Sequence, residues 1–283
     1  MIDLHAHSLF SDGTDTPEAL ARMADSAEVS ALALTDHDTV DGIPAFLAQQ
    51  PFVKARLIVG TELSCRFLDQ SLHVLGLLVD HTNPVFLARL ADLRLRRDDR
   101  NRRLVAKLQE LGFHIGMEDV QAQANSPLLS RVHFAKALAA KGIIKHPQQA
   151  FESLLNDGGR AWVPREELEP SEAALWIREA GGVPVVAHPG RFGGGSFVWD
   201  KAMKDLRDQG MEGLEAYYGD YAAAQQRSFT ALAAKLGMAM SGGSDYHGRN
   251  KPAIRLGRGR GSLHVPDALL EGLEARRRER PAH

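Results

Sequence analysis

The chain has 283 residues and a mass of 30.9 kDa, and 44% of its residues are hydrophobic and 25% charged. This composition is that of an ordinary globular protein, which excludes intrinsic disorder and collagen-like repeats for most of the length. The formal net charge is −2, so no overall positive field would hold a long polyanion, and we expect no binding of duplex DNA.

Cysteine content and hydropathy narrow the class of protein further. The sequence has one cysteine, Cys65, which excludes an intrachain disulfide framework and a zinc site built from several thiolates. No apolar run approaches the roughly 20 residues of a membrane helix. The N-terminal segment has no basic region before an apolar stretch, so we expect no signal peptide, no membrane association and a cytoplasmic location.

Short apolar runs alternate with helix-like segments along the chain. Thr16 followed by Pro17 predicts the N-cap and first turn of a helix that extends to about residue 28. Strands are predicted at residues 2–4, 31–34, 57–59, 72–79, 183–187, 213–217 and 238–240. Apolar strands that alternate with helices are typical of a parallel sheet covered on both faces. We therefore predict an α/β fold and favour a closed or nearly closed barrel over an open doubly wound sheet.

The alternation is interrupted in the middle of the chain. A long helix is predicted from Asn83 to Leu111, with Gly112 as its stop signal. Its many basic residues and its leucines at helical spacing favour a solvated amphipathic helix over an RNA-binding track. Residues 113–169 are predicted to be helical or irregular. We therefore predict a small, mainly helical insertion at 100–168 over the mouth of the barrel, whose own sequence would be 1–99 and 169–283.

Histidines and carboxylates gather at the predicted strand ends, and His73 lies within the fourth predicted strand. The motifs are His5-Ala6-His7 with Asp12, Thr35-Asp36-His37-Asp38, Gly60-Thr61-Glu62, Ala187-His188-Pro189 and Gly242-Gly243-Ser244-Asp245-Tyr246-His247. Each motif alone has an ordinary explanation. A His-X-His pair is often structural, and Asp36, Asp38 and Gly242-Gly243-Ser244 are typical of turns.

The combination of motifs indicates more than any one of them. In a parallel barrel the carboxyl ends of all strands open onto one face, and alternate residues of an extended segment point the same way. Carboxylates gathered there would repel one another without a cation. Neutral imidazoles together with carboxylates suit Zn, Mn or Fe better than Mg or Ca. The sequence therefore predicts a site for several metal ions.

These motifs resemble the successive motifs of the PHP (polymerase and histidinol phosphatase) family of metal-dependent phosphoesterases, from the first strand to about residue 250. The resemblance implies a distorted (β/α)7 barrel with two to three divalent ions, Mn first and Fe or Zn as alternatives. Many family members have histidine in place of Asp12. The implied ligands are His5, His7, Glu62 and Asp245 for the first metal, Glu62, His73 and His188 for the second, and Asp12, His37 and His247 for the third.

Within the family, the chain most resembles the bacterial nucleoside 3′,5′-bisphosphate phosphatases and short-RNA 5′→3′ exonucleases. The features behind this finer resemblance are the helical insertion and the segments Ser130-Arg131-Val132-His133-Phe134 and His188-Pro189-Gly190-Arg191. It implies an enzyme that removes the 3′-phosphate of a small nucleotide, with water activated by the metals for in-line attack on phosphorus. The alternatives are a 5′→3′ exoribonuclease on short 5′-phosphorylated RNA, a histidinol-phosphate-type phosphatase and a non-enzymatic, metal-stabilised binding domain.

Three further residues are candidates for contact with a small nucleotide or short oligonucleotide. Arg191 follows the histidine of the fourth motif closely, and a guanidinium donates two parallel hydrogen bonds to phosphate. Arg131 and His133, in the insertion, are candidates for a second phosphate or a base; alternatively, Ser130 caps a helix and Arg131 is solvated. Glu215, near a strand end, is a candidate hydrogen-bond partner of a ligand histidine. No side chain is assigned as a general acid.

Overall fold

The structure, a computed structural model, describes residues 1–124, 129–164, 167–192 and 198–279. The strands are β1 (Ile2–Asp3), β2 (Ala31–Leu34), β3 (Arg56–Phe67), β4 (Gln70–Leu77), β5 (Val183–Val186), β6 (Gly213–Tyr218) and β7 (Ala239–Gly243). The α-helices are α1 (Pro17–Ser26), α2 (Ile43–Leu47), α3 (Pro84–Glu110), α4 (Met117–Gln121), α5 (Arg131–Ala140), α6 (Ala150–Ser153), α7 (Pro170–Glu179), α8 (Trp199–Asp208), α9 (Ala223–Leu236) and α10 (Ala268–Arg278).

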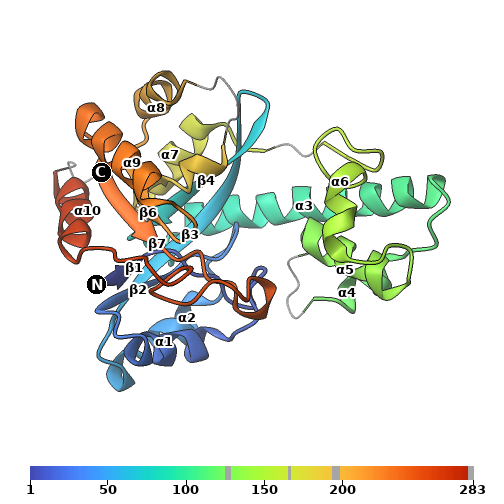
Figure 1. Cartoon of the computed structure of the whole chain (residues 1–283), viewed down its shortest axis with the longest axis horizontal. Helices are drawn as coiled ribbons and strands as arrows, with labels where there is room; N and C mark the ends of the chain where they lie inside the picture. Colours follow the sequence, from blue (N-terminus) through green and yellow to red (C-terminus); the bar gives the residue numbers. More distant parts are fainter. Residues whose placement is uncertain (125–128, 165–166, 193–197, 280–283) are drawn as a thin grey trace.

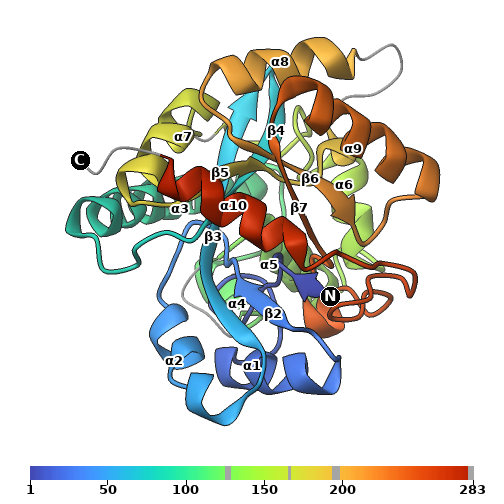
Figure 2. The ribbon, with the colours of Figure 1, turned by 90° about the vertical axis from the view of Figure 1, so that its left-hand side faces the viewer.

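The seven strands form one sheet in sequence order that closes into a barrel. At the closure the Leu4 amide donates to the Gly242 carbonyl (3.0 Å), and the Asp245 amide donates to the His5 carbonyl (2.9 Å). Helices α1, α2, α7, α8 and α9 surround the sheet (Figures 1 and 2). The predicted α/β barrel is confirmed, and the open doubly wound sheet is wrong.

One strand departs from the parallel arrangement that the alternation predicts. β4 runs antiparallel to both β3 and β5, whereas the other neighbouring strands are parallel. β3 continues to Phe67, well past the predicted end at residue 59, and turns into β4 through Leu68 and Asp69, which have φ of 48° and 58°. This two-residue turn with left-handed backbone is typical of a tight hairpin. Because β4 runs backwards, its beginning, with His73, lies beside the carboxyl end of β5.

Apolar side chains fill one end of the barrel interior. Ile2, Leu4, Ile58, Leu75 and Val185 belong to one buried cluster, which helix α10 joins through Leu270 and Leu273. Helix α10 lies across this end of the barrel (Figure 2). Burial of these side chains closes that end to water, so the polar motifs at the strand ends face the opposite, open end.

The long helix α3 leads from the barrel into a smaller lobe that contains α4, α5 and α6 (Figure 1). The Asn83 side chain accepts from the Phe86 amide (3.0 Å) and Pro84 fills the first helical position, which explains the predicted start. The lobe has an apolar cluster of its own, which includes Leu108 and Phe134. The insertion bounds 100–168 stay a prediction, since α3 continues unbroken through residue 100.

Among the described helices, none has both the length and the apolar character needed to cross a bilayer.

Candidate metal centre

Glu62 lies at the centre of a cluster that contains all nine predicted ligand side chains. Its Oε1 atom lies 2.9 Å from both His73 Nδ1 and His188 Nε2. Its Oε2 atom lies 3.1 to 3.3 Å from ring nitrogens of His5, His7 and His37. The antiparallel direction of β4 brings His73 here, and β3 supplies Glu62 from within the strand rather than from its end. One buried carboxylate therefore faces five imidazoles from four segments of the chain.

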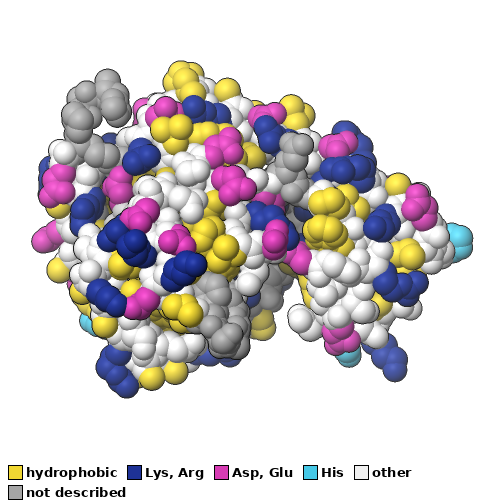
Figure 3. Space-filling model, turned by 90° about the horizontal axis from the view of Figure 1, so that it is seen from above, with side chains coloured by type: hydrophobic (Ala, Val, Ile, Leu, Met, Phe, Trp, Pro, Cys, Tyr) yellow, Lys and Arg dark blue, Asp and Glu magenta, His cyan; other side chains and the backbone are white. Residues whose placement is uncertain are grey.

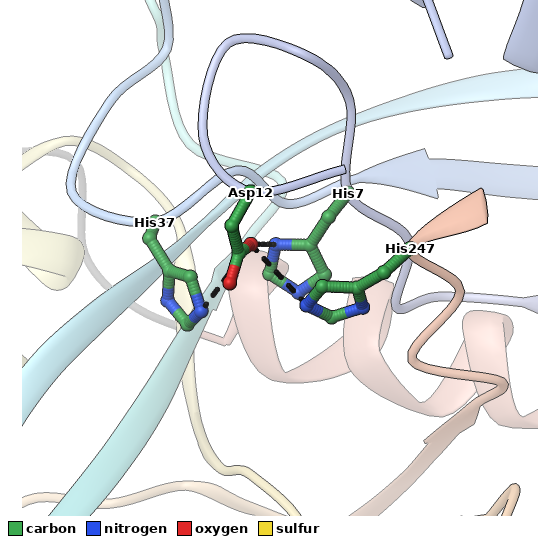
Figure 4. Close-up of side chains that lie close together, drawn as sticks. All are labelled: His7, Asp12, His37 and His247. Atoms are coloured by element: carbon green, nitrogen blue, oxygen red, sulfur yellow. Dashed lines mark ion pairs between the residues drawn. The ribbon is translucent and has the colours of Figure 1, made fainter. Parts of the chain in front are cut away.

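A second carboxylate, Asp12, faces three imidazoles at one side of the cluster (Figure 4). Its Oδ1 atom lies 3.2 Å from His247 Nε2, 3.8 Å from His7 Nδ1 and 3.9 Å from His37 Nε2. These side chains come from the segments that follow β1, β2 and β7. The geometry thus brings Asp12, His37 and His247 together as the resemblance implies, and adds His7 to them.

Asp245 connects the cluster to the surrounding cations and hydroxyls. Its Oδ1 atom lies 3.5 Å from His5 Nε2 and 3.4 Å from His7 Nε2. Its Oδ2 atom accepts from Tyr218 Oη (2.7 Å) and Lys251 Nζ (2.5 Å). One oxygen is therefore available to the cluster while the other is held by residues outside it.

The candidate ligand atoms form four overlapping groups, each with atoms within 4.8 Å of one another. His7 belongs to two of them, and His37 lies both with Asp12 and with Glu62 and His73. The nine side chains thus share one site. The assignment of each side chain to a particular metal stays a prediction.

The backbone at the cluster is unusual in three places. His188 and Asp245 have φ of 25° and 56°, a region that side chains with a Cβ rarely adopt. Such backbone conformations persist where the surrounding structure holds them, often at functional sites. Gly243 lies against β1, where an added Cβ would come within 2.4 Å of the His5 Cβ. The reading of Gly242-Gly243 as a turn is wrong, because both residues lie in β7. Gly243 permits the close approach to His5.

Glu215 on β6 orients two of the candidate ligands from behind. It is fully buried, and it accepts from His5 Nδ1 (2.9 Å) and from the His188 amide (2.6 Å). The predicted hydrogen bond between Glu215 and a candidate ligand histidine is confirmed for His5. A bulge between Glu215 and Tyr217 shifts the alternation of β6, so Tyr218, three residues later, also reaches the cluster.

Two further aspartates after β2 hold the segments that carry the candidate ligands. Asp36 accepts from the Ser8 amide (2.8 Å), the Ser8 hydroxyl (2.6 Å) and the Ser11 hydroxyl (2.6 Å). Asp38 accepts from the Ser64 amide (2.8 Å) and pairs with Arg97 of α3. Both carboxylates are buried, so neither is merely a turn former.

Burial and charge shift the pKa values of the cluster in opposite directions. Burial alone would raise the pKa of Glu62, but the nearby His37, His73 and His5 hold it well below its usual value. Burial would lower the pKa of His7, but hydrogen bonds with Asp245 and Glu62 outweigh burial and raise that pKa to about 9. The buried carboxylates therefore stay ionised and need nearby positive charge.

The donor set fits divalent metal ions. His5 Nε2 and His7 Nε2 lie 3.1 Å apart and face the same carboxylate oxygens. Because His5 Nδ1 donates to Glu215, the Nε2 atom of neutral His5 carries a lone pair that is directed into the cluster. Imidazole nitrogens and carboxylate oxygens that converge in this way are the ligands of Mn, Fe and Zn sites.

Glutamine at position 215 will weaken metal binding without replacing a ligand. The Glu215→Gln variant keeps the shape but removes the charge that holds the His5 ring. We expect the affinity for divalent metal to fall by roughly 10- to 100-fold, measured by titration of the metal-depleted protein. The exposed Glu179→Gln variant is the control. An unchanged affinity in Glu215→Gln would show that Glu215 does not orient His5.

A cavity of about 370 Å³ extends from the cluster to the smaller lobe. Charged and apolar side chains gather where the lobe meets the barrel (Figure 3). Beyond the cluster, its wall includes Arg66, Arg97, Arg100, Arg131, Phe151, Asp157, Trp162, Glu167, Arg191 and Lys251.

The predicted substrate contacts lie in different positions around this cavity. Arg191 lies at the edge of the cluster, with Nη1 3.2 Å from Tyr218 Oη. Arg131 lines the cavity and pairs with Asp157 (2.7 Å). His133 is buried outside the cavity lining and accepts the Ser130 amide (3.0 Å) at the start of α5. Burial lowers the pKa of His133 to about 4, so its ring is neutral. Arg131 and Arg191 therefore line the cavity, whereas His133 does not.

The long helix is amphipathic as predicted, but two of its arginines are not on the solvated face. Arg97 and Arg100 are 5% and 7% exposed and line the cavity. Arg96 and Arg103, by contrast, are on the solvent side and pair with acids one turn away. The buried face of α3 therefore contributes positive charge to the cavity.

Comparisons with known proteins agree with this geometry. The family model of the PHP domain matches residues 3–144. The 3′,5′-nucleoside bisphosphate phosphatase of Chromobacterium violaceum is 31% identical over 247 residues, 87% of each protein. The 5′-3′ exoribonuclease of Haemophilus influenzae is 31% identical over 245 residues, 87% of this chain and 89% of that protein. The crystal structure of a proposed metal-dependent phosphoesterase from Bifidobacterium adolescentis is 29% identical, with a TM-score of 0.84 over 97% of this chain and 95% of that one. These findings confirm the family that the motifs predicted: the chain belongs to the PHP domain family.

Proposed function

We propose that this protein is a metal-dependent phosphoesterase that removes the 3′-phosphate from nucleoside 3′,5′-bisphosphates. The observation that carries the proposal is a cavity that joins the carboxylate and imidazole cluster to a wall with arginines and aromatic rings. The Chromobacterium relative, named a 3′,5′-nucleoside bisphosphate phosphatase, supports this choice of substrate. A nucleoside bisphosphate presents two phosphates and a base, and the cavity offers arginines and aromatic rings to bind them.

The predicted ligands would hold two to three divalent ions, and we favour Mn. These nine ligands are His5, His7, Asp12, His37, Glu62, His73, His188, Asp245 and His247. Bound ions of this kind lower the pKa of a coordinated water towards neutrality and neutralise phosphate oxygens. Glu62 and Asp245 place negative charge where cations are required, and Glu215 fixes the orientation of His5. The apolar plug at the far end of the barrel keeps water from that side.

Arg191 and Lys251 place positive charge beside the cluster, where the transferred phosphate would lie. Arg191 Nη1 lies 3.5 Å from Asp245 Oδ2, and Lys251 donates to the same oxygen. Arg191 is more than half exposed, so its guanidinium is accessible to a ligand. We expect it to bind nonbridging phosphate oxygens and to stabilise the negative charge on the phosphate.

The lobe would bind the rest of the nucleotide. Arg131 on α5 is the candidate for the second phosphate. Phe151 and Val163 pack against the apolar core of the lobe and also line the cavity, as Trp162 does. Aromatic rings bind any nucleobase by stacking, since every base has a π-face. We therefore expect recognition of a base with little preference among bases.

A second candidate function is 5′→3′ exoribonuclease activity on short RNA. The same arrangement would hold a 5′-phosphate on the lobe while a phosphodiester lies at the cluster. The Haemophilus relative, named a 5′-3′ exoribonuclease, favours this reading. The two activities differ in the bond that is cut, so substrates can separate them.

A phosphate-release panel tests the proposal. Protein supplied with Mn would be assayed with adenosine 3′,5′-bisphosphate, a 5′-phosphorylated trinucleotide, histidinol phosphate and an aryl phosphate. We expect the highest kcat/KM for the bisphosphate, with adenosine 5′-monophosphate as the product. Preferred release of mononucleotides from the trinucleotide would favour the exoribonuclease. Preferred hydrolysis of histidinol phosphate would contradict both.

Removal of the Trp162 ring will weaken binding of nucleotides and leave smaller phosphate esters unaffected. Base–aromatic stacking contributes roughly 1–3 kcal/mol per base. We therefore expect Trp162→Ala to raise KM for the bisphosphate roughly tenfold, and Trp162→Phe to restore most of the affinity. The measurement is KM for the bisphosphate against KM for an aryl phosphate. An equal rise for both substrates would contradict a stacking role.

A further inference from the structure

Two arginines from different parts of the chain meet at one carboxylate inside the cavity. Arg66 is on β3 of the barrel and Arg131 begins α5 in the lobe. Arg131 Nη1 lies 2.7 Å from Asp157 Oδ1, and Arg66 Nη1 lies 3.4 Å from Asp157 Oδ2. All three residues line the cavity. Asp157 thus occupies a position between two guanidinium groups, as a phosphate would.

Both arginines have a second anchor. Arg66 Nη1 also lies 3.4 Å from Glu167 Oε2, and Arg66 Nη2 donates to the Asp69 carbonyl (2.7 Å). Arg131 Nη1 donates to the Leu155 carbonyl (3.1 Å). These contacts would keep the two guanidinium groups in place if the Asp157 carboxylate moved away. The arginines therefore form an anion site that does not depend on Asp157 for its shape.

The contacts of Asp157 are weak enough to be displaced. Its side chain is 38% exposed, and those of Arg66 and Arg131 are 29% and 34% exposed. Ion pairs with this much solvent contribute little free energy. A phosphate monoester carries more charge and more acceptor oxygens than a carboxylate and suits the paired donors of arginine better.

We propose that Arg66 and Arg131 form a subsite for the phosphate that the enzyme does not remove, and that Asp157 is an internal competitor for this subsite. The proposal rests on the proposed function in its choice of ligand, a nucleoside 5′-phosphate. When the ligand binds, its 5′-phosphate replaces the Asp157 carboxylate between the two arginines. Asp157 therefore weakens binding of every ligand that carries this phosphate and leaves ligands without it unaffected.

Calorimetry on the metal-loaded protein tests the proposal directly. Adenosine 5′-monophosphate and adenosine would be titrated into the wild type and Asp157→Asn. We expect the Kd of adenosine 5′-monophosphate to fall roughly three- to tenfold in the variant, while the Kd of adenosine stays the same. Asp92→Asn, which breaks an Asp–Arg pair on the solvent side of α3, is the matched control and should change neither. An unchanged or higher Kd for adenosine 5′-monophosphate in Asp157→Asn would overturn the proposal, because Asp157 would then not compete.

Two further arms keep the test independent of folding and of the proposed reaction. Asp157→Ser gives the same comparison if the asparagine variant does not fold. The gain from Asp157→Asn should shrink in an Arg66→Gln background, and a gain of undiminished size there would contradict the shared subsite. Failure of the wild type to hydrolyse adenosine 3′,5′-bisphosphate would refute the proposed function, whereas the binding comparison would still decide the role of Asp157.

Discussion

Replacing Glu62 with glutamine will reduce phosphate release by roughly a thousandfold or more. Glu62 contacts five of the six imidazoles of the cluster, with atoms 2.9 to 3.3 Å apart. Glutamine retains the shape but has no charge and one acceptor oxygen, so it would hold divalent ions less strongly than the carboxylate. A loss of several kcal/mol of stabilisation of the phosphate charge would account for an effect of this size.

The measurement is kcat/KM for adenosine 3′,5′-bisphosphate, together with the metal content of the purified variant. Glu179→Gln, an exposed carboxylate that pairs with Arg89 on the outer surface, is the matched control and should retain full activity. The Glu62→Gln variant should also contain less metal than the wild type. If it kept both its metal and most of its activity, Glu62 would not be a central ligand.

The second large effect concerns the attachment of α3 to the barrel. Asp38 and Arg97 form an ion pair in which the side chains are 2% and 6% exposed. Loss of one partner leaves the other charge buried, which typically costs roughly 3–5 kcal/mol. We expect Asp38→Ala to lower the free energy of unfolding by about this amount, measured by urea-induced unfolding of the wild type and the variant.

The exposed pair between Asp92 and Arg96 on the same helix provides the control. Asp92→Ala should change the free energy of unfolding by about 1 kcal/mol or less. If Asp38→Ala were as mild as Asp92→Ala, the buried pair would not hold α3 against the barrel. Both pairs join an aspartate to an arginine of α3, so the difference between the two variants in the free energy of unfolding measures the effect of burial.

The sequence predicts the barrel because several strands are short apolar runs in which every residue is buried, as is typical of a sheet covered on both faces. β2 is an example, with all four residues buried. The direction of β4 is not encoded in its apolar pattern, since the pattern reads the same for a parallel and an antiparallel strand. The predicted end of β3 at residue 59 is where its continuous apolar run ends. Beyond it, Leu63, Cys65 and Phe67 alternate with polar residues, and the hairpin with β4 extends the strand through them.

The candidate ligands could be predicted because histidines and carboxylates recur at the ends of several apolar strands. The residues that form the wall of the cavity could not be predicted in this way. Arg97 and Arg100 sit among other arginines of α3, and only the packing of the lobe determines which of them are buried. Tyr218 reaches Asp245 through a bulge that leaves no clear sequence signal. Trp162 lies in a lobe segment with no motif around it, and only the fold brings it to the same cavity as Arg131.

The direct test of the metal centre is the elemental content of the protein, purified without chelators, combined with anomalous diffraction at the absorption edge of the element found. The arrangement of His5, Glu62, His188 and Asp245 predicts more than one divalent ion per chain, with anomalous peaks among these side chains. Protein that contains no transition metal, and binds none when Mn is supplied, would contradict the account. Peaks located only elsewhere on the molecule would contradict it equally.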